Sequence, residues 1–399
     1  MRDLRNEPAG ISLRIVGMNT SIFMLAFAAW VIFGPSGRFI AQEFGLTAAT
    51  ATLIKTLPIL IGSVMRIPVG ILADRLGARL VFSAIMFFAS ACSFGLSYSA
   101  NSAHLVLGSV MLGMVGTSFA VGVQSVSSWT PKERQGYALG IFGAGNIGTA
   151  ITTFGLPLLL TTMGWRGAFR VYSAVLAFGG MAYWLGVRNA PRRAGRLTLA
   201  GMLEPLRSAA AWRVGFYYMG TFGVFVAATL GLTDLYIDAY DFPVSTAGLL
   251  ATTFTFTASL ARIPGGRLAD TYGADAVVRA SLSIAGIALL TIGLGMSAAV
   301  AVGLAFVAAL ALGAGMAGTF KYIPELFPAS VGAAGGIVGA LGGLGGFLLP
   351  QASAMVKGVA GSAAAQVIPL GLLALLAAVV HYRATAAAGD LELERSLAD

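Results

Sequence analysis

The sequence has few charged residues, one cysteine and two histidines. Asp, Glu, Lys and Arg make up only 10% of its 399 residues, whereas soluble domains carry about 25%. This shortage excludes a large water-soluble domain. The single cysteine, Cys92, excludes an intramolecular disulfide and a CxxC metal or redox motif, so we interpret it as a buried structural thiol.

Long apolar stretches fill the chain instead. Hydrophobic residues make up 57% of the sequence, and segments of about 20 apolar residues, enough to cross a hydrocarbon core of about 30 Å, recur throughout. We predict an all-α integral membrane protein with twelve transmembrane helices. They lie near residues 16–36, 49–72, 79–99, 102–128, 137–162, 167–187, 213–236, 245–268, 275–296, 298–321, 330–356 and 362–383. No nucleophile–base pair or metal-ligand cluster falls within these spans, so we expect no enzyme activity, no cofactor and no metal.

The two halves of the sequence are related by duplication. Arg66-Ile-Pro-Val-Gly-Ile-Leu-Ala-Asp74-Arg-Leu-Gly77 reappears 196 residues later as Arg262-Ile-Pro-Gly-Gly-Arg-Leu-Ala-Asp270-Thr-Tyr-Gly273. At the same offset Gly136, Gly140 and Gly143 fall on Gly332, Gly336 and Gly339. Six spans per half give both copies the same orientation, an arrangement known in transporters. We therefore predict two pseudo-symmetric six-helix bundles, at 1–187 and 213–383, with a cytoplasmic linker at 188–212 and a tail at 384–399.

The net charge of +9 would indicate nucleic acid in a soluble protein, but here it follows the topology. Most Lys and Arg residues fall on one side of the predicted spans, including Arg192, Arg193 and Arg196 of the linker. This asymmetry fits the positive-inside rule with both termini in the cytoplasm, and we expect the chain to lie in the cytoplasmic membrane. Nucleic acid is excluded as the explanation for the charge.

Two arginines lie deep inside predicted spans. Arg66 precedes Asp74, at the cytoplasmic end of its helix, by eight residues, which places it about 12 Å into the membrane. Arg262 has the same depth in the other half. An arginine there costs at least about 2.5 kcal/mol, and no carboxylate is expected at this depth, although helix carbonyls or water remain possible partners. Two unpaired guanidiniums predict a site for a small planar oxyanion, which their donor forks match.

The fifth and eleventh predicted spans are rich in glycine. Small residues at helical spacing let helices approach closely, so packing is their simplest role. Asn146, within the fifth span, is different, because an amide in the membrane interior needs a partner. It could donate to the same anion. A phosphate-loop interpretation of these glycines fails, since no strand precedes them and no Gly-Lys-Ser/Thr follows.

Several motifs carry a family resemblance. The stretch Gly70-x-x-x-Asp74-Arg75-x-Gly77-x-Arg79 resembles the signature of the major facilitator superfamily. Gly143-Ala-Gly145-Asn146-Ile-Gly148, Thr221-Phe-Gly-Val-Phe225, Phe320-Lys-x-x-Pro324 and Gly342-Gly343-x-Gly-Gly-Phe347 are similar to segments of the nitrate/nitrite porter family, and the resemblance covers nearly the whole chain. The eleventh span departs from the family pattern, because Gly342 and Gly343 stand there without an asparagine.

The resemblance implies roles for individual residues. Arg66 and Arg262 would clamp the anion, Asn146 would hydrogen-bond to it and Tyr218 would contribute a hydroxyl. The aromatic rings implied to enclose the anion are Phe27, Phe119 and Phe222. The residues expected to serve the conformational change are Gly70, Asp74, Arg75, Gly77, Gly143, Gly145, Gly148, Gly339, Gly342 and Gly343.

The function implied is transport of nitrate and nitrite across the membrane by alternating access. We expect a monomer whose partners are these two anions and the lipid bilayer. Nitrate-for-nitrite exchange is electroneutral and needs no titratable group, which favours it, but proton symport stays open. The rival interpretations are a carrier of another small anion, such as formate, oxalate or a monocarboxylate, and a nitrate sensor derived from a transporter.

Overall fold

The computed structural model describes residues 12–190 and 199–398, which are almost entirely helical and contain no strand. The first half comprises α1 (Leu13–Trp30), α2 (Phe33–Phe44), α3 (Ala48–Val64), α4 (Arg66–Leu76), α5 (Ala78–Leu96), α6 (Ser102–Gly113), η2 (Met114–Thr117), α7 (Ser118–Ser128), η3 (Lys132–Arg134), α8 (Gln135–Gly143), η4 (Ala144–Ile147) and α9 (Gly148–Gly186). After α10 (Leu199–Arg207), the second half comprises α11 (Ala209–Tyr218), η5 (Met219–Gly223), α12 (Val224–Tyr240), α13 (Val244–Tyr272), α14 (Ala274–Gly293), α15 (Ala298–Leu326), α16 (Val331–Ala360), η6 (Ala364–Val367) and α17 (Ile368–Ala398).

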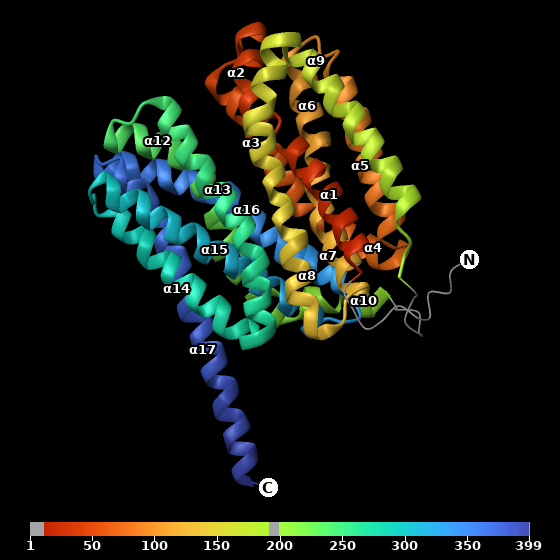
Figure 1. Ribbon diagram of the computed structural model, residues 1–399, viewed down its shortest axis with the longest axis vertical. Coiled ribbons are helices and arrows are strands. Elements are labelled where there is room, and N and C mark those ends of the chain that lie inside the picture. The colour runs from red at the N-terminus through yellow and green to blue at the C-terminus, as the bar shows by residue number, and fades with distance from the viewer. Residues whose placement is uncertain (1–11, 191–198, 399) are drawn as a thin grey trace.

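The described helices provide twelve candidate membrane spans, as predicted. Ten helical segments are long and apolar enough to span it, and α3 with α4 forms an eleventh span, bent by 44°. One of the ten, Lys132–Gly186, has 55 residues, or about 80 Å of helix, far more than a bilayer needs. Gly164 interrupts it with φ 67° and ψ 173°, and the ribbon turns back there (Figure 1). This segment therefore supplies two spans.

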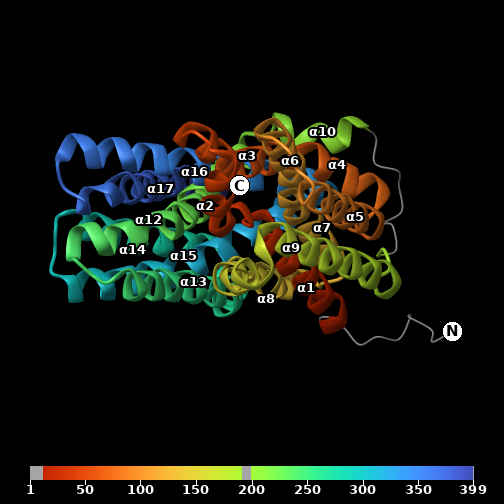
Figure 2. The same cartoon turned by 90° about the horizontal axis from the view of Figure 1, so that it is seen from above.

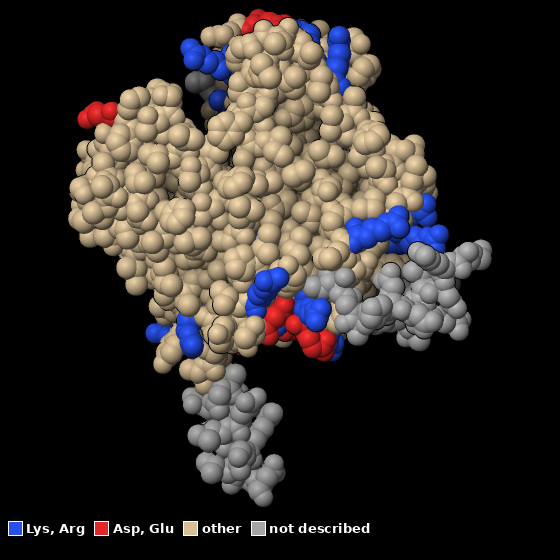
Figure 3. All heavy atoms as spheres, in the orientation of Figure 1, with Lys and Arg blue, Asp and Glu red and all other residues tan. Residues whose placement is uncertain are grey.

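The spans form two bundles that lie side by side, which confirms the predicted fold class. Seen from above, α1–α9 occupy one side and α11–α17 the other (Figure 2). In the space-filling view the charged side chains gather toward the two ends, and the belt between them is almost free of charge (Figure 3). A belt of this kind suits the hydrocarbon core of a bilayer.

Some boundaries differ from the prediction. The span predicted at 49–72 is broken at Met65, directly before Arg66; Pro68 lacks an N–H, and its ring disfavours helix at Val64, four residues earlier. The last helix, predicted to end at 383, continues to Ala398. The linker residues Arg192, Arg193 and Arg196, and residues 1–11, lie outside the described residues.

Candidate anion-binding site

Arg66 and Arg262 are both fully buried where the two bundles meet. Arg66 is the first residue of α4, and Arg262 lies within α13. Both guanidiniums face the ring of Phe222, whose centroid lies 5.7 Å from Cζ of Arg66 and 5.9 Å from Cζ of Arg262. The arginines of the two halves therefore flank one ring. Among the described residues, neither forms an ion pair with a carboxylate.

Arg66 is partly held by backbone carbonyls. Its Nε donates to the Gly116 carbonyl at 2.9 Å, and its Nη1 donates to the carbonyl of Gly339 on α16, in the opposite half. The third nitrogen, Nη2, is buried without a hydrogen-bond partner. Helix carbonyls, which the sequence left open as partners, thus satisfy two of the three nitrogens of Arg66.

Arg262 has fewer partners. Its Nη2 donates to the thioether sulfur of Met316, a weak acceptor. Its Nε and Nη1 are buried without partners. An unsatisfied buried donor costs about 1–3 kcal/mol, and more when the group is charged. The two arginines are therefore not equivalent, and Arg262 keeps more donors for a ligand.

Aromatic rings from both halves surround the guanidiniums. Phe119 lies 5.1 Å from Cζ of Arg66, and Phe320 lies 5.3 Å from Cζ of Arg262. Tyr218 stacks on Phe222 at 5.0 Å and on Phe119 of the opposite half at 5.7 Å. These rings keep bulk water away, and in a low-dielectric environment electrostatic attraction to an anion is stronger.

Asn146 carries a second set of unpaired groups. Its side chain is fully buried, and neither the amide nitrogen nor the amide oxygen has a hydrogen-bond partner. One turn earlier on the same span, a Cβ on Gly143 would lie 2.5 Å from Nη1 of Arg262. The helix that carries Asn146 therefore packs directly on Arg262, although the two belong to different halves.

Three irregular helical turns shape the site. Gly116 lies in η2, a 3₁₀ turn, Asn146 lies in η4, another 3₁₀ turn, and Phe222 lies in η5, a π-helical turn. Such interruptions inside helices are frequent at functional sites. They also free backbone carbonyls and redirect side chains, and here one such carbonyl binds Arg66.

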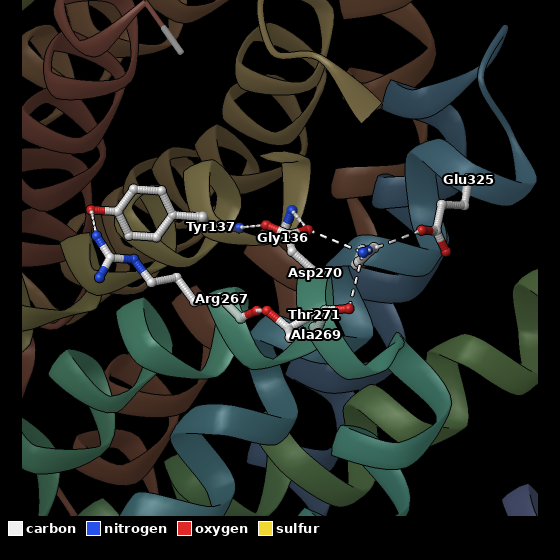
Figure 4. Close-up of polar contacts among 8 residues, drawn as sticks. Gly136, Tyr137, Arg267, Ala269, Asp270, Thr271 and Glu325 are labelled. Atoms are coloured by element: carbon white, nitrogen blue, oxygen red, sulfur yellow. Dashed lines mark hydrogen bonds and ion pairs between the residues drawn. The ribbon is translucent and has the colours of Figure 1, made fainter. Parts of the chain in front are cut away.

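At one end the two halves are joined by a pair of equivalent contacts. Asp74 accepts hydrogen bonds from the backbone N–H groups of Gly332 and Ala333 at 2.9 and 2.8 Å. Asp270 accepts them from Gly136 and Tyr137 at 2.9 and 2.8 Å (Figure 4). Each carboxylate thus caps the N-terminus of a helix in the other half, where the helix dipole favours negative charge. These contacts hold this end closed.

A buried lysine adds a third group to the Asp270 contact. Lys321 forms an ion pair with Asp270 at 3.1 Å and donates to the Ala269 carbonyl at 2.9 Å (Figure 4).

In the other half, Gly77 follows the last residue of α4 with φ 89°, a conformation that glycine adopts without strain. Arg75 lies in the last turn of the same helix.

The comparisons with known proteins agree with this architecture. The profile of the Major Facilitator Superfamily matches residues 20–245 and 215–394. A probable nitrate/nitrite antiporter of Thermus thermophilus is 36% identical over 370 residues, 85% of this chain and 84% of that protein. The nitrite extrusion protein of Bacillus subtilis (strain 168) is 32% identical, over 89% of this chain and 90% of that protein. The chain belongs to the nitrate/nitrite porter family of the major facilitator superfamily. The resemblance seen in the sequence is confirmed.

The fold of this porter is also that of solved transporters of the superfamily. The crystal structure of a human organic anion transporter superposes with a TM-score of 0.75, at 16% identity, over 92% of this chain and 99% of that one. At this identity the likeness concerns the fold alone.

The porter brings together most of the residues singled out in its sequence. Phe27 lies one ring away from the arginines, packed on Phe23 at 4.4 Å and on Trp30 at 5.0 Å. Trp30, three residues later on α1, contacts Arg66, with its ring centroid 5.4 Å from Cζ. The sequence analysis did not single out Trp30, Phe320 or Met316 as site residues. For Phe320 a signal existed, because it begins one of the family-like motifs.

Six of the predicted conformational glycines fall into two groups. Gly143, Gly339 and Gly343 approach an arginine of the opposite half. Gly145 and Gly148 instead pack on α1 within their own half, and Gly342 faces Tyr218 within the second half. The first group therefore lies where the two halves must move past each other.

Proposed function

We propose that this porter carries nitrate and nitrite across the cytoplasmic membrane by alternating access, as a monomer with both termini in the cytoplasm. The observation that carries the proposal is the set of buried donors without partners: Nη2 of Arg66, Nε and Nη1 of Arg262, and the Asn146 amide. They come from both halves, and no carboxylate of the described chain pairs with the arginines. A small planar anion supplies the missing acceptors and the missing negative charge.

The proposed cycle uses the two bundles as moving bodies. Residues 1–187 and 213–383 would rock about the anion site, joined by 188–212, with 384–399 as a cytoplasmic tail. In the proposed orientation the Asp74 and Asp270 contacts lie at the cytoplasmic end, so the structure is closed on that side. Bound anion reduces the repulsion between Arg66 and Arg262 and so favours states in which the two halves come together around it.

Exchange of nitrate for nitrite is the proposed coupling. Moving one anion inward against a potential of 100 mV costs about 2.3 kcal/mol, and counter-movement of a second anion cancels this cost. Within the described chain, no Asp, Glu or His is among the residues that contact the two guanidiniums. A proton would therefore have to travel with the anion or with water.

Uptake into liposomes tests the function. We expect labelled nitrate to enter vesicles loaded with nitrite and to enter empty vesicles far more slowly. Uptake into empty vesicles driven by a proton gradient would contradict exchange and support proton symport. Uptake of labelled formate or oxalate without nitrate uptake would point to the other anions, and saturable nitrate binding without any uptake would point to a sensor.

Replacing Asn146 by leucine should separate binding from stability. A hydrogen bond to a charged group is worth about 1.5–3 kcal/mol, so nitrate should bind about ten- to a hundredfold more weakly. The substrate-free protein should be at least as thermostable as the wild type, because the variant removes a buried amide without partners. Nitrate titrations and melting curves in detergent measure both quantities.

Asn19 offers a matched control for this variant. It is also fully buried, but its amide donates to the Ile15 carbonyl at 2.8 Å and accepts from the Tyr183 hydroxyl at 2.8 Å. Asn19→Leu should therefore lower the melting temperature and leave nitrate affinity unchanged. If Asn146→Leu behaved like Asn19→Leu, the assignment of Asn146 to the anion would be wrong.

A further inference from the structure

A cavity lined mainly by threonines lies between the two halves. Its volume is about 100 Å³. The threonines of its wall are Thr149 and Thr153 of α9, Thr229 and Thr233 of α12, and Thr252 and Thr255 of α13. Because α9 belongs to one half and α12 and α13 to the other, the cavity changes size when the halves move.

The cavity lies outward of the arginines, away from the closed end. Thr149 and Thr153 follow Asn146 by three and seven residues, about 5 and 10 Å along the helix. Thr252 precedes Arg262 by ten residues on α13, whereas Asp270 follows Arg262 by eight. The end opposite Asp270 is also where the surface is notched between the two halves (Figure 3). The cavity is therefore on the path from that surface to the anion site.

Hydroxyl groups give this cavity its chemistry. Thr149, Thr153 and Thr252 donate to carbonyls of their own helices at 2.8, 2.9 and 2.8 Å, and Thr229 pairs with Thr255 at 3.1 Å. Each hydroxyl can rotate, and it offers one donor and two acceptor positions. At about 30 Å³ per molecule of liquid water, the space accommodates about three waters or one small oxyanion with part of its hydration shell.

The charges around the cavity are few. No Asp, Glu, Lys or Arg lines it. Asp234 follows Thr233, but it is exposed and takes no part in the wall. Farther inward lie Arg262 and Arg66, fully buried and without carboxylate partners among the described residues. Their positive potential favours an anion in the cavity over a cation.

We infer that this threonine-lined cavity is an outer binding station, where a small hydrated oxyanion exchanges part of its water shell for hydroxyl groups before it reaches the arginines. The inference rests on the proposed function for the identity of the anion. The simpler alternative is that these threonines are packing residues that satisfy themselves on their own helices. Thr253 is such a residue, exposed and bonded to the Leu249 carbonyl at 2.9 Å.

Cysteine labelling distinguishes an outer binding station from threonines that serve only in packing. Cys92 is the only cysteine, so Cys92→Ser provides a background without thiols. In it, Thr153→Cys and Thr252→Cys each place a thiol in the cavity, and Thr253→Cys is the matched control outside it. Each variant is reconstituted and treated with a negatively charged sulfonatoethyl thiosulfonate or a positively charged trimethylammonioethyl thiosulfonate, with and without nitrate. Rates are expressed relative to those of a free thiol.

We expect both cavity cysteines to react, with the anionic reagent favoured about tenfold or more, as in a cleft of one charge sign, and with nitrate slowing the reaction. Thr253 is exposed within a membrane span, so Thr253→Cys should face lipid and should not react with these water-soluble reagents. Absence of reaction at both cavity positions, or equal relative rates for the two reagents, would overturn the inference. Nitrate uptake by the wild type in the same liposomes tests the proposed function separately. Anion-selective labelling without nitrate uptake would keep the station and reject nitrate as the transported anion.

Discussion

Replacing Arg262 by lysine should lower nitrate transport by about a hundredfold or more. The variant keeps the charge but loses the planar fork, and with it at least two charge-assisted hydrogen bonds of about 1.5–3 kcal/mol each. Each 1.4 kcal/mol is a factor of ten. Because Nε and Nη1 of Arg262 have no partner in the protein, the loss should fall on anion binding and leave the melting temperature near that of the wild type.

Arg66→Lys should behave differently. Arg66 binds the carbonyls of Gly116 and Gly339, the second across the interface between the halves. Its replacement should therefore lower both transport and the melting temperature. Equal effects of the two lysine variants on stability would contradict the inequivalence of the arginines.

The same substitution outside the site serves as the control. Arg267 lies five residues after Arg262 on α13, where its exposed side chain donates to the Tyr137 hydroxyl at 3.0 Å. Arg267→Lys should keep most of the transport activity. A loss as large as that of Arg262→Lys would show that any disturbance of α13 stops transport, and the anion-binding argument would fail.

The depth and symmetry of the arginines could be predicted because both are properties of the covalent chain. Duplication fixes equivalent positions, and eight residues of helix between Arg66 and Asp74 fix a distance from the membrane surface. The unequal partners of the two guanidiniums could not be predicted. They depend on Met316 and on the Gly116 carbonyl in a 3₁₀ turn, and no periodicity in the sequence marks such a turn.

The aromatic rings show the same limit. Phe27 and Trp30 lie three residues apart and share a face of α1, so only the rotation of that helix decides which of them contacts Arg66. That rotation follows from packing between helices far apart in the chain. The sequence predicts that the glycine-rich spans pack closely against other helices. The structure shows at which glycines the backbone of the opposite half leaves no room for a Cβ.

Adding one methyl group at Gly70 and one at Gly266 should stop transport by preventing closure. A Cβ on Gly70 would overlap the carbonyl of Gly332, and a Cβ on Gly266 would overlap the carbonyl of Gly136. Both obstacles are backbone atoms of the opposite half, so no side-chain rotation relieves them. Overpacking costs about 1–3 kcal/mol per site, and only the state closed at the Asp74 and Asp270 end bears this cost. The double alanine variant should therefore populate that state about thirty-fold or more below the wild type.

A cysteine at the contact between Asp74 and α16 reports directly how often this end is closed. Ala333 is 1% exposed and donates its N–H to Asp74, so Ala333→Cys in the Cys92→Ser background should react slowly with a water-soluble thiol reagent and much faster once Gly70 and Gly266 are alanine. The control is Gly303→Ala on α15, where a Cβ would meet nothing within 4 Å and where alanine favours the helix by about 1 kcal/mol. This variant should transport normally. Wild-type uptake and slow labelling in the double variant would mean that the close approach of the halves at these glycines is not required by the transport cycle.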